Sequence, residues 1–362
     1  MVKVFRVHEH GGPEVLRWEE VEIEEPGQGE IRMRNTAIGV NFLDVYMRKG
    51  VYPTPLPFTP GTRTSTTETI TVCSRFNQTA HLTRVVLCCS AGVESVGVVT
   101  AVGPEVTGIV VGDVVGLAGS PMVTGRTYAE EQIIPAAVAI PIPDWMDHKV
   151  AASVLVKGIT ARILVRQAFK VEAGQTVLVH AAAGGVGSLV CQWASALGAT
   201  VIGAVSSRAK AEQAAANGCH HVVVYTEEED FVARVRDGIT AGRGVDVVYD
   251  AVGKDTSRGS IACLANRGCL VAFGEASGAP EPFVLGELQP RSLSVTCPAL
   301  PGYTGTREAL LESAAEVFAG LASGVLRAHV GGVYPLAEAP RAHADLEGRR
   351  TSGSIVLVPG NE

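Results

Sequence analysis

One stretch, Thr176 to Trp193 with the sequence TVLVHAAAGGVGSLVCQW, constrains the fold more than any other part of the chain. A short apolar run suited to a buried strand leads into a loop of small residues, and the loop leads into an amphipathic helix. Against the pattern G-x-G-x-x-G the loop aligns as Ala182–Gly187, with Ala182 in place of the first glycine. This order of elements is typical of a dinucleotide-binding unit. The alternative is a tight strand-to-helix turn that binds nothing.

The glycines in this loop have separate tasks in a dinucleotide site. Gly184 lets the backbone approach a pyrophosphate, and Gly187 allows the helix to pack closely on the strand. The first turn of the helix offers unpaired N–H groups and the positive end of the helix dipole to the phosphates. We therefore expect the cofactor to contact Gly184, Gly185, Val186 and Gly187.

The end of the second strand, predicted over Thr200–Val205, indicates which dinucleotide binds. An NAD site carries Asp or Glu here for the ribose hydroxyls. This chain has Ser206, Ser207, Arg208 and Lys210, and hydroxyls and cations suit a 2′-phosphate. The pattern favours NADPH. The alternative is a solvated helix start in which serine caps the helix and lysine faces water.

The order of expected strands, turns and helices along the chain predicts an α/β fold with two parts. Short strands separated by Gly and Pro turns, such as Lys3–Val7 and Val110–Val115, suggest a barrel-like β domain in the first part. From Lys149 onward apolar strands alternate with helices, which predicts a doubly wound parallel sheet. The apolar tail Ser354–Val358 is expected to return to the first part.

Composition excludes several classes of protein. The chain has 362 residues, a net charge of −7, and no apolar run long enough to span a membrane. The charge gives no general basis for binding nucleic acid, and the eight cysteines show no zinc-site spacing. With no apolar leader at the start, we expect a cytoplasmic protein with reduced thiols.

Several motifs spread along the chain carry a family resemblance. They are HGGPEVLRW (His10–Trp18), NFLDVYMRKGVYP (Asn41–Pro53), LPFTPG (Leu56–Gly61), VGVVTAVG (Val96–Gly103), VLVHAAAGGVG (Val177–Gly187), GRGVDVVYDAVGKDT (Gly242–Thr256) and RRTSGSIVLVP (Arg349–Pro359). Together they resemble the zeta-crystallin-like quinone oxidoreductases, a zinc-free branch of the medium-chain dehydrogenase/reductase superfamily. The resemblance implies a GroES-like β-barrel catalytic domain over residues 1–156 and 298–362. It also implies a Rossmann domain over residues 157–297, NADPH as cofactor, and a homodimer.

The same resemblance assigns site residues. It places Asn41 and Tyr46 beside the nicotinamide, as catalytic and cofactor-binding residues, and Tyr52 at the substrate mouth. The further cofactor contacts that it implies are Thr160, Ser206, Lys210, Tyr225, Phe273, Gly274 and Ser277. Glu275 and Cys297 depart from the family, which usually has an amide and an arginine at these positions.

The implied reaction is hydride transfer from NADPH to a quinone or a related α,β-unsaturated carbonyl, without a metal. A quinone spreads the incoming charge over its ring, so proximity to the nicotinamide can suffice. The alternative is a non-catalytic protein that keeps the fold for binding a cofactor or nucleic acid.

The segment Thr62–Gly92 does not fit the family pattern. Deleting these 31 residues joins PFTPG to VESVGVV, and the segment is rich in Thr and Ser. One hypothesis is a translated intron, because the codons for its ends permit a GT donor and an AG acceptor in frame. The alternative is a genuine surface insertion, which costs little loop-closure entropy. Transcripts that uniformly retain these codons would refute the intron.

Overall fold

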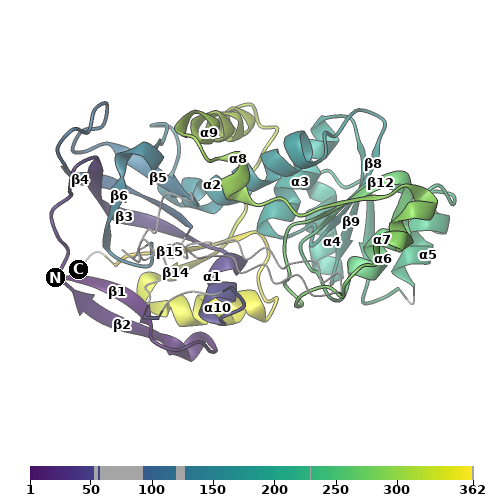
Figure 1. The fold of residues 1–362 in the computed structure, drawn as a ribbon, viewed down its shortest axis with the longest axis horizontal. Coiled ribbons are helices and arrows are strands. Elements are labelled where there is room, and N and C mark those ends of the chain that lie inside the picture. The colour runs from purple at the N-terminus through teal and green to yellow at the C-terminus, as the bar shows by residue number, and fades with distance from the viewer. Residues whose placement is uncertain (53–55, 58–92, 120–126, 229, 361–362) are drawn as a thin grey trace, which may run out of the picture.

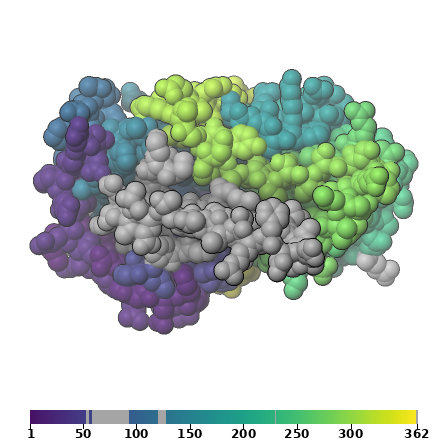
Figure 2. All heavy atoms as spheres, viewed as in Figure 1, coloured from purple at the N-terminus to yellow at the C-terminus, as the bar shows by residue number. Residues whose placement is uncertain are grey.

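The computed structural model describes residues 1–52, 56–57, 93–119, 127–228 and 230–360. The segment Thr62–Gly92 therefore lies outside the described residues. Two sheets form the two ends of an elongated molecule, and helix α2 (His148–Ile163) runs between them (Figure 1). In the space-filling view the purple N-terminal residues occupy one end and green residues the other (Figure 2). Within the described ranges, no helix has the length and apolarity needed to cross a membrane.

One sheet is a doubly wound parallel sheet of six strands, as predicted. Its order is β10-β9-β8-β11-β12-β13, and every neighbouring pair is parallel. Chain order reverses between β8 and β11, and doubly wound sheets bind their ligands at the carboxyl ends of the strands at such a point. The strands are β8 (Thr176–His180), β9 (Thr200–Val205), β10 (His221–Val224), β11 (Val245–Asp250), β12 (Leu264–Ala272) and β13 (Ser294–Thr296).

Helices connect these strands. The glycine-rich loop leads into α3 (Gly185–Ala196), and β9 leads into α4 (Arg208–Ala216). The connections from β10 to β13 contain α5 (Phe231–Ala233), extended by a π-helical turn to Ile239, then α6 (Ser257–Cys263) and α7 (Leu285–Leu288). The predicted alternation of strand and helix is thereby confirmed.

The second sheet is mixed and has the order β14-β15-β3-β4-β5-β7, with β6 also paired to β3. The C-terminal strand β15 pairs with β3, so the tail returns to the first part of the chain as predicted. The pairings between described strands leave β14 and β7 as edges, so they do not close the expected barrel. The strands are β3 (Glu30–Val40), β4 (Glu94–Val102), β5 (Val114–Ala118), β6 (Glu131–Pro135), β7 (Ile140–Pro141), β14 (Val330–Pro335) and β15 (Ser354–Val358).

Beside this sheet lie a hairpin and four helices. The hairpin pairs β1 (Val2–Val7) with β2 (Leu16–Val21). The helices are α1 (Phe42–Arg48), α8 (Leu300–Tyr303), α9 (Arg307–Ala322), which packs on α2, and α10 (Ala339–Glu347). The strand predicted over Val110–Val115 is wrong over residues 110–113, because β5 begins only at Val114. Val110 and Val111 are 63% and 62% exposed, because the carboxylate of Asp113 accepts a hydrogen bond from the Val110 N–H and closes a turn.

A buried polar chain ties α1 to α10. Arg48 is fully buried, and its Nη1 donates to Nδ1 of His343 at 3.0 Å. Because arginine can only donate, Nδ1 carries no proton, and the neutral ring holds its proton on Nε2. That Nε2–H donates to the Tyr128 hydroxyl at 2.9 Å, and the hydroxyl donates to Asp44 at 3.2 Å. The carboxylate of Asp44 also accepts from the backbone N–H of Asn41, where α1 begins.

These hydrogen-bonded side chains make the stability of the protein depend on pH. Burial first, and the Arg48 cation second, lower the pKa of His343 from 6.5 to about 3. The folded state therefore keeps the ring neutral, while the unfolded chain takes up a proton below 6.5, so stability falls as the pH falls through that value. We expect the free energy of unfolding to drop by about 2 kcal/mol from this group between about pH 7 and about pH 5.

Urea unfolding of the wild type and of His343→Asn at both pH values measures this dependence. Asparagine keeps an oxygen for Arg48 but does not titrate. Burial also lowers the pKa of His180, which is present in both proteins and cancels from the comparison. Equal acid losses in the two proteins would contradict the assignment.

Candidate active site

The glycine-rich loop is shaped as a phosphate cradle. Gly184 is the N-cap of α3 in extended backbone, and its N–H donates to the carbonyl of Ala181 at 2.8 Å. A Cβ on Gly187 would lie 2.3 Å from that carbonyl oxygen, so the close packing of helix on strand requires glycine there. Gly185 and Val186 form the first turn of α3, whose unpaired N–H groups suit a pyrophosphate. The residues present therefore fit a dinucleotide.

At the end of β9 the structure brings together a second set of predicted residues. Ser207 caps α4 by accepting from the Lys210 N–H at 3.4 Å, and Tyr225 follows β10 with 36% of its surface exposed. The half-buried Lys210 extends its Nζ to the carbonyl of Arg349 at 3.0 Å. Partial burial, together with the Arg349 guanidinium, lowers the pKa of Lys210. Lys210 and Arg349 therefore bring two cations close together beyond the end of β9.

Sequence reasoning missed Arg349, which belongs to the segment after α10. Its backbone is left-handed, with φ +56°, and this conformation sends its carbonyl to Lys210. Arg208, in contrast, has a side chain that is 83% exposed and paired with Glu227. Ser206 uses its carbonyl to accept from the Thr226 hydroxyl.

The loop after β12 is held against the loop after β11. The Phe273 N–H donates to the carbonyl of Asp250, and a Cβ on Gly274 would lie 2.8 Å from the carbonyl oxygen of Ala251. Ser277 donates from its hydroxyl to the carbonyl of Val252 at 2.8 Å and accepts from the Asp255 N–H. These three predicted residues thus lie in the loop beyond the carboxyl end of β12, the edge at which doubly wound sheets bind ligands, and backbone contacts fix that loop.

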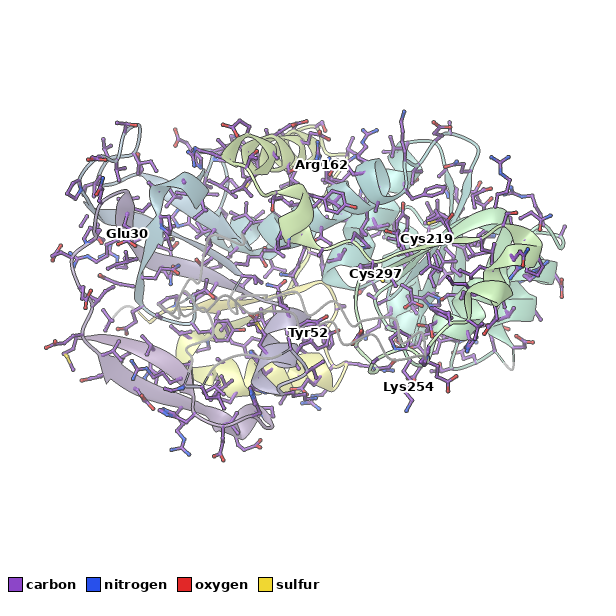
Figure 3. All side chains as sticks on the ribbon, in the orientation of Figure 1. Glu30, Tyr52, Arg162, Cys219, Lys254 and Cys297 are labelled. Carbon is purple, nitrogen blue, oxygen red and sulfur yellow. The ribbon has the colours of Figure 1, made fainter. Side chains whose placement is uncertain are left out.

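The residues predicted to lie beside the nicotinamide and the substrate gather around α1, and this part of the site is called the acceptor side. Tyr46 is 9% exposed, and its ring meets the ring of Tyr52 edge-on at 5.4 Å. The Tyr46 hydroxyl oxygen accepts from the backbone N–H of Glu275 at 3.0 Å, which links α1 to the loop after β12. Burial raises the pKa of Tyr46 far above its usual range, so its hydroxyl stays protonated. Tyr52 and Cys297 both lie in the central region of the molecule (Figure 3).

Asn41, at the start of α1, contacts two residues that sequence reasoning missed. Its Nδ2 donates to the buried carboxylate of Glu94 at 3.0 Å, and Lys157 donates to the same carboxylate at 2.6 Å. Lys157 lies on α2, one turn before the half-buried Thr160. The signal for both was a single charged residue within an apolar run, in VESVGVV and SVLVKGIT. Among the described residues, no three His, Cys, Asp or Glu side chains form a group that could hold a metal ion.

Glu275 and Cys297, the two residues that depart from the family pattern, lie close together. Burial raises the pKa of the Cys297 thiol, and the Glu275 carboxylate adds to this effect. The same carboxylate contributes to the raised pKa of Tyr46. A negative charge therefore stands beside the acceptor side of the crevice.

Comparison with known proteins places the chain in a family. Residues 185–316 match the zinc-binding dehydrogenase family. The chain is 42% identical to 2-haloacrylate reductase from a Burkholderia species, over 99% of each chain. It is 41% identical to quinone oxidoreductase from Pseudomonas aeruginosa, over 99% of this chain and 100% of that one.

A solved structure agrees with these relatives. Escherichia coli quinone oxidoreductase, solved as a complex with NADPH, superposes with a TM-score of 0.86 at 40% identity. The superposition covers 99% of this chain and 100% of that one. The chain therefore belongs to the quinone oxidoreductase family of the medium-chain dehydrogenase/reductase superfamily.

Proposed function

We propose that this protein is an NADPH-dependent oxidoreductase that reduces quinones or related conjugated carbonyls. The observation that carries the proposal is the hydrogen bond from the Glu275 N–H to the Tyr46 hydroxyl, at 3.0 Å. It sets the acceptor-side helix α1 against the crevice of the parallel sheet, so an acceptor beside α1 lies close to a dinucleotide held by the Gly184–Gly187 loop. Bound NADPH supplies the hydride.

The chain's own residues bind and orient. The first turn of α3 holds the pyrophosphate, and Lys210 with Arg349 neutralises the 2′-phosphate. The Tyr46 hydroxyl accepts from Glu275 and stays protonated, so its O–H can donate a hydrogen bond to the carbonyl oxygen of an acceptor. Tyr52 packs against Tyr46 and shapes the apolar wall on which an aromatic acceptor would stack.

An acceptor panel tests the proposal. Purified protein is mixed with NADPH and with quinones, 2-haloacrylate and other enones in turn, and NADPH oxidation is followed by absorbance. Turnover with at least one conjugated acceptor is the expected result. NADPH binding without turnover on any acceptor would instead favour the non-catalytic alternative, and nucleic-acid retention assays on the same protein would test that reading.

Lys210→Ala should weaken NADPH binding far more than NADH binding. The lost contact is charge-assisted and partly desolvated, which corresponds to about 1.5–3 kcal/mol, or about 10- to 150-fold in Kd. Titration of each cofactor by fluorescence measures the effect. Arg208→Ala is the matched control and should change little, because that side chain points to solvent and Glu227. Equal losses of affinity for NADPH and NADH would show that Lys210 does not bind the 2′-phosphate.

The remaining family-based expectations are part of the same proposal. Residues 157–297 would hold the cofactor, and residues 1–156 with 298–362 would hold the acceptor. A homodimer and a cytoplasmic location are proposed on the same family basis. Light scattering on the purified protein tests the first of these two, and cell fractionation tests the second.

A further inference from the structure

The strongest unexplained feature near the site is a fully buried carboxylate. Glu94 begins β4 with 0% of its surface exposed. A charge taken out of water in this way is tolerated only when it is paired and hydrogen-bonded. Three donors meet it: Lys157 Nζ at 2.6 Å, the Val156 N–H at 2.8 Å and Asn41 Nδ2 at 3.0 Å.

The fold makes room for this carboxylate. A Cβ on Gly39 of β3 would lie 2.2 Å from Glu94 Oε2, so only glycine leaves the space that the charge fills. The Lys157 side chain is equally confined, with 5% of its surface exposed. A Cβ on Gly185 would lie 2.7 Å from Lys157 Cδ, so the lysine stem packs directly against the glycine-rich loop.

The carboxylate decides which way the Asn41 amide points. A carboxylate can only accept hydrogen bonds, so the NH₂ end of the amide must face it. The same Nδ2 also donates to the carbonyl of Gly39 at 3.3 Å. Both amide protons are thereby used, and the amide oxygen is the accepting end, on the side of the capping box that Asn41 forms with Asp44 at the start of α1. Without Glu94 the amide loses its shorter hydrogen bond, and the contact to Gly39 at 3.3 Å is the one that remains on Nδ2.

We propose that Glu94 and Lys157 are positioning residues for the hydride transfer. The buried pair fixes the Asn41 amide on the acceptor side and the Gly185 turn on the cofactor side, so one ion pair sets both walls of the reaction centre. This inference rests on the proposed NADPH-dependent reduction, because it concerns the geometry of that step. The ion pair acts through Asn41 and the loop, without contact to the reacting atoms.

The test is a double-mutant cycle on turnover. Glu94→Gln is expected to lower kcat by about 10- to 100-fold, since a displacement of about 1 Å at the reacting atoms costs about that much. Asn41→Ala should lower kcat as well, and Glu94→Gln added to Asn41→Ala should have little further effect. Glu316→Gln is the matched control. Glu316 of α9 pairs with Arg162, which lies on α2 as Lys157 does, and this variant should leave kcat unchanged.

Loss of folding must be separated from loss of positioning. Glu94→Gln leaves the Lys157 charge buried without its partner, whereas Glu94→Gln with Lys157→Met removes both charges. We expect this double variant to melt near the wild type and still turn over slowly. Recovery of wild-type kcat in it, or losses that add in the Asn41 cycle, would overturn the positioning role. Absence of wild-type turnover across the acceptor panel would refute the proposed function, and this inference with it.

Discussion

Replacement of Arg48 by methionine should lower the free energy of unfolding by about 3–5 kcal/mol, because one partner of a buried charge pair is removed. The guanidinium is fully buried and has three acceptors: the carbonyl of Gly11 at 3.2 Å, Nδ1 of His343 and the carboxylate of Glu347. Methionine fills similar space but satisfies none of them. His343 and the Gly11 carbonyl then lose their donor, Glu347 keeps Lys49 as its only cation among the described residues, and the direct contact between α1 and α10 through Arg48 is lost.

Urea unfolding curves measure this loss, and Arg17→Met provides the control. Arg17 also pairs with a glutamate, Glu9, at 3.4 Å, but both side chains are more than half exposed. An exposed pair of this kind contributes at most about 1 kcal/mol. Similar losses in the two variants would show that the buried hydrogen bonds of Arg48 add no stability beyond that of a surface ion pair.

Local patterns made much of the cofactor side predictable. The Gly184–Gly187 loop, its strand and its helix are consecutive in sequence. One short motif therefore contains the glycines that the tight turn between strand and helix needs. Lys210 was selected in the same way, because it stands a fixed distance beyond β9, and its contact with the cofactor stays a prediction. The alternation of apolar runs with helices likewise predicted the parallel sheet, since each run must be buried on both faces.

Contacts between distant parts of the chain were not predictable. Glu94 and Lys157 are 63 positions apart, and Arg48 and His343 are 295 apart. No local pattern says which buried charge meets which partner; only the folded sheets bring them together. The error at Val110–Val115 has the opposite origin, because β-branched residues favour a strand while the Asp113 side chain closes a turn there.

The anomalous segment joins the fold at a sensitive point. Gly92 is followed directly by Val93, which is 4% exposed and whose carbonyl accepts from the Gly119 N–H at 2.7 Å. The next residue is Glu94, whose carboxylate holds Asn41. A change in the chain just before Val93 therefore acts first on the Glu94–Asn41 contact and reaches the Gly184–Gly187 loop only through Lys157, whereas Lys210 lies in the other sheet's connections.

Deletion of residues 62–92 should raise quinone turnover by about a hundredfold while leaving NADPH affinity nearly unchanged. The reason is positioning: the shortened chain of 331 residues joins Gly61 to Val93 as the family resemblance implies, and an error of about 1 Å at the reacting atoms costs about that factor in rate. The melting temperature should rise as well. Kinetics, cofactor titration and melting curves on both proteins measure this. Equal turnover and equal melting temperature would show that the segment is a tolerated insertion, because a segment foreign to the fold could not leave the Glu94–Asn41 contact and the stability of the protein untouched.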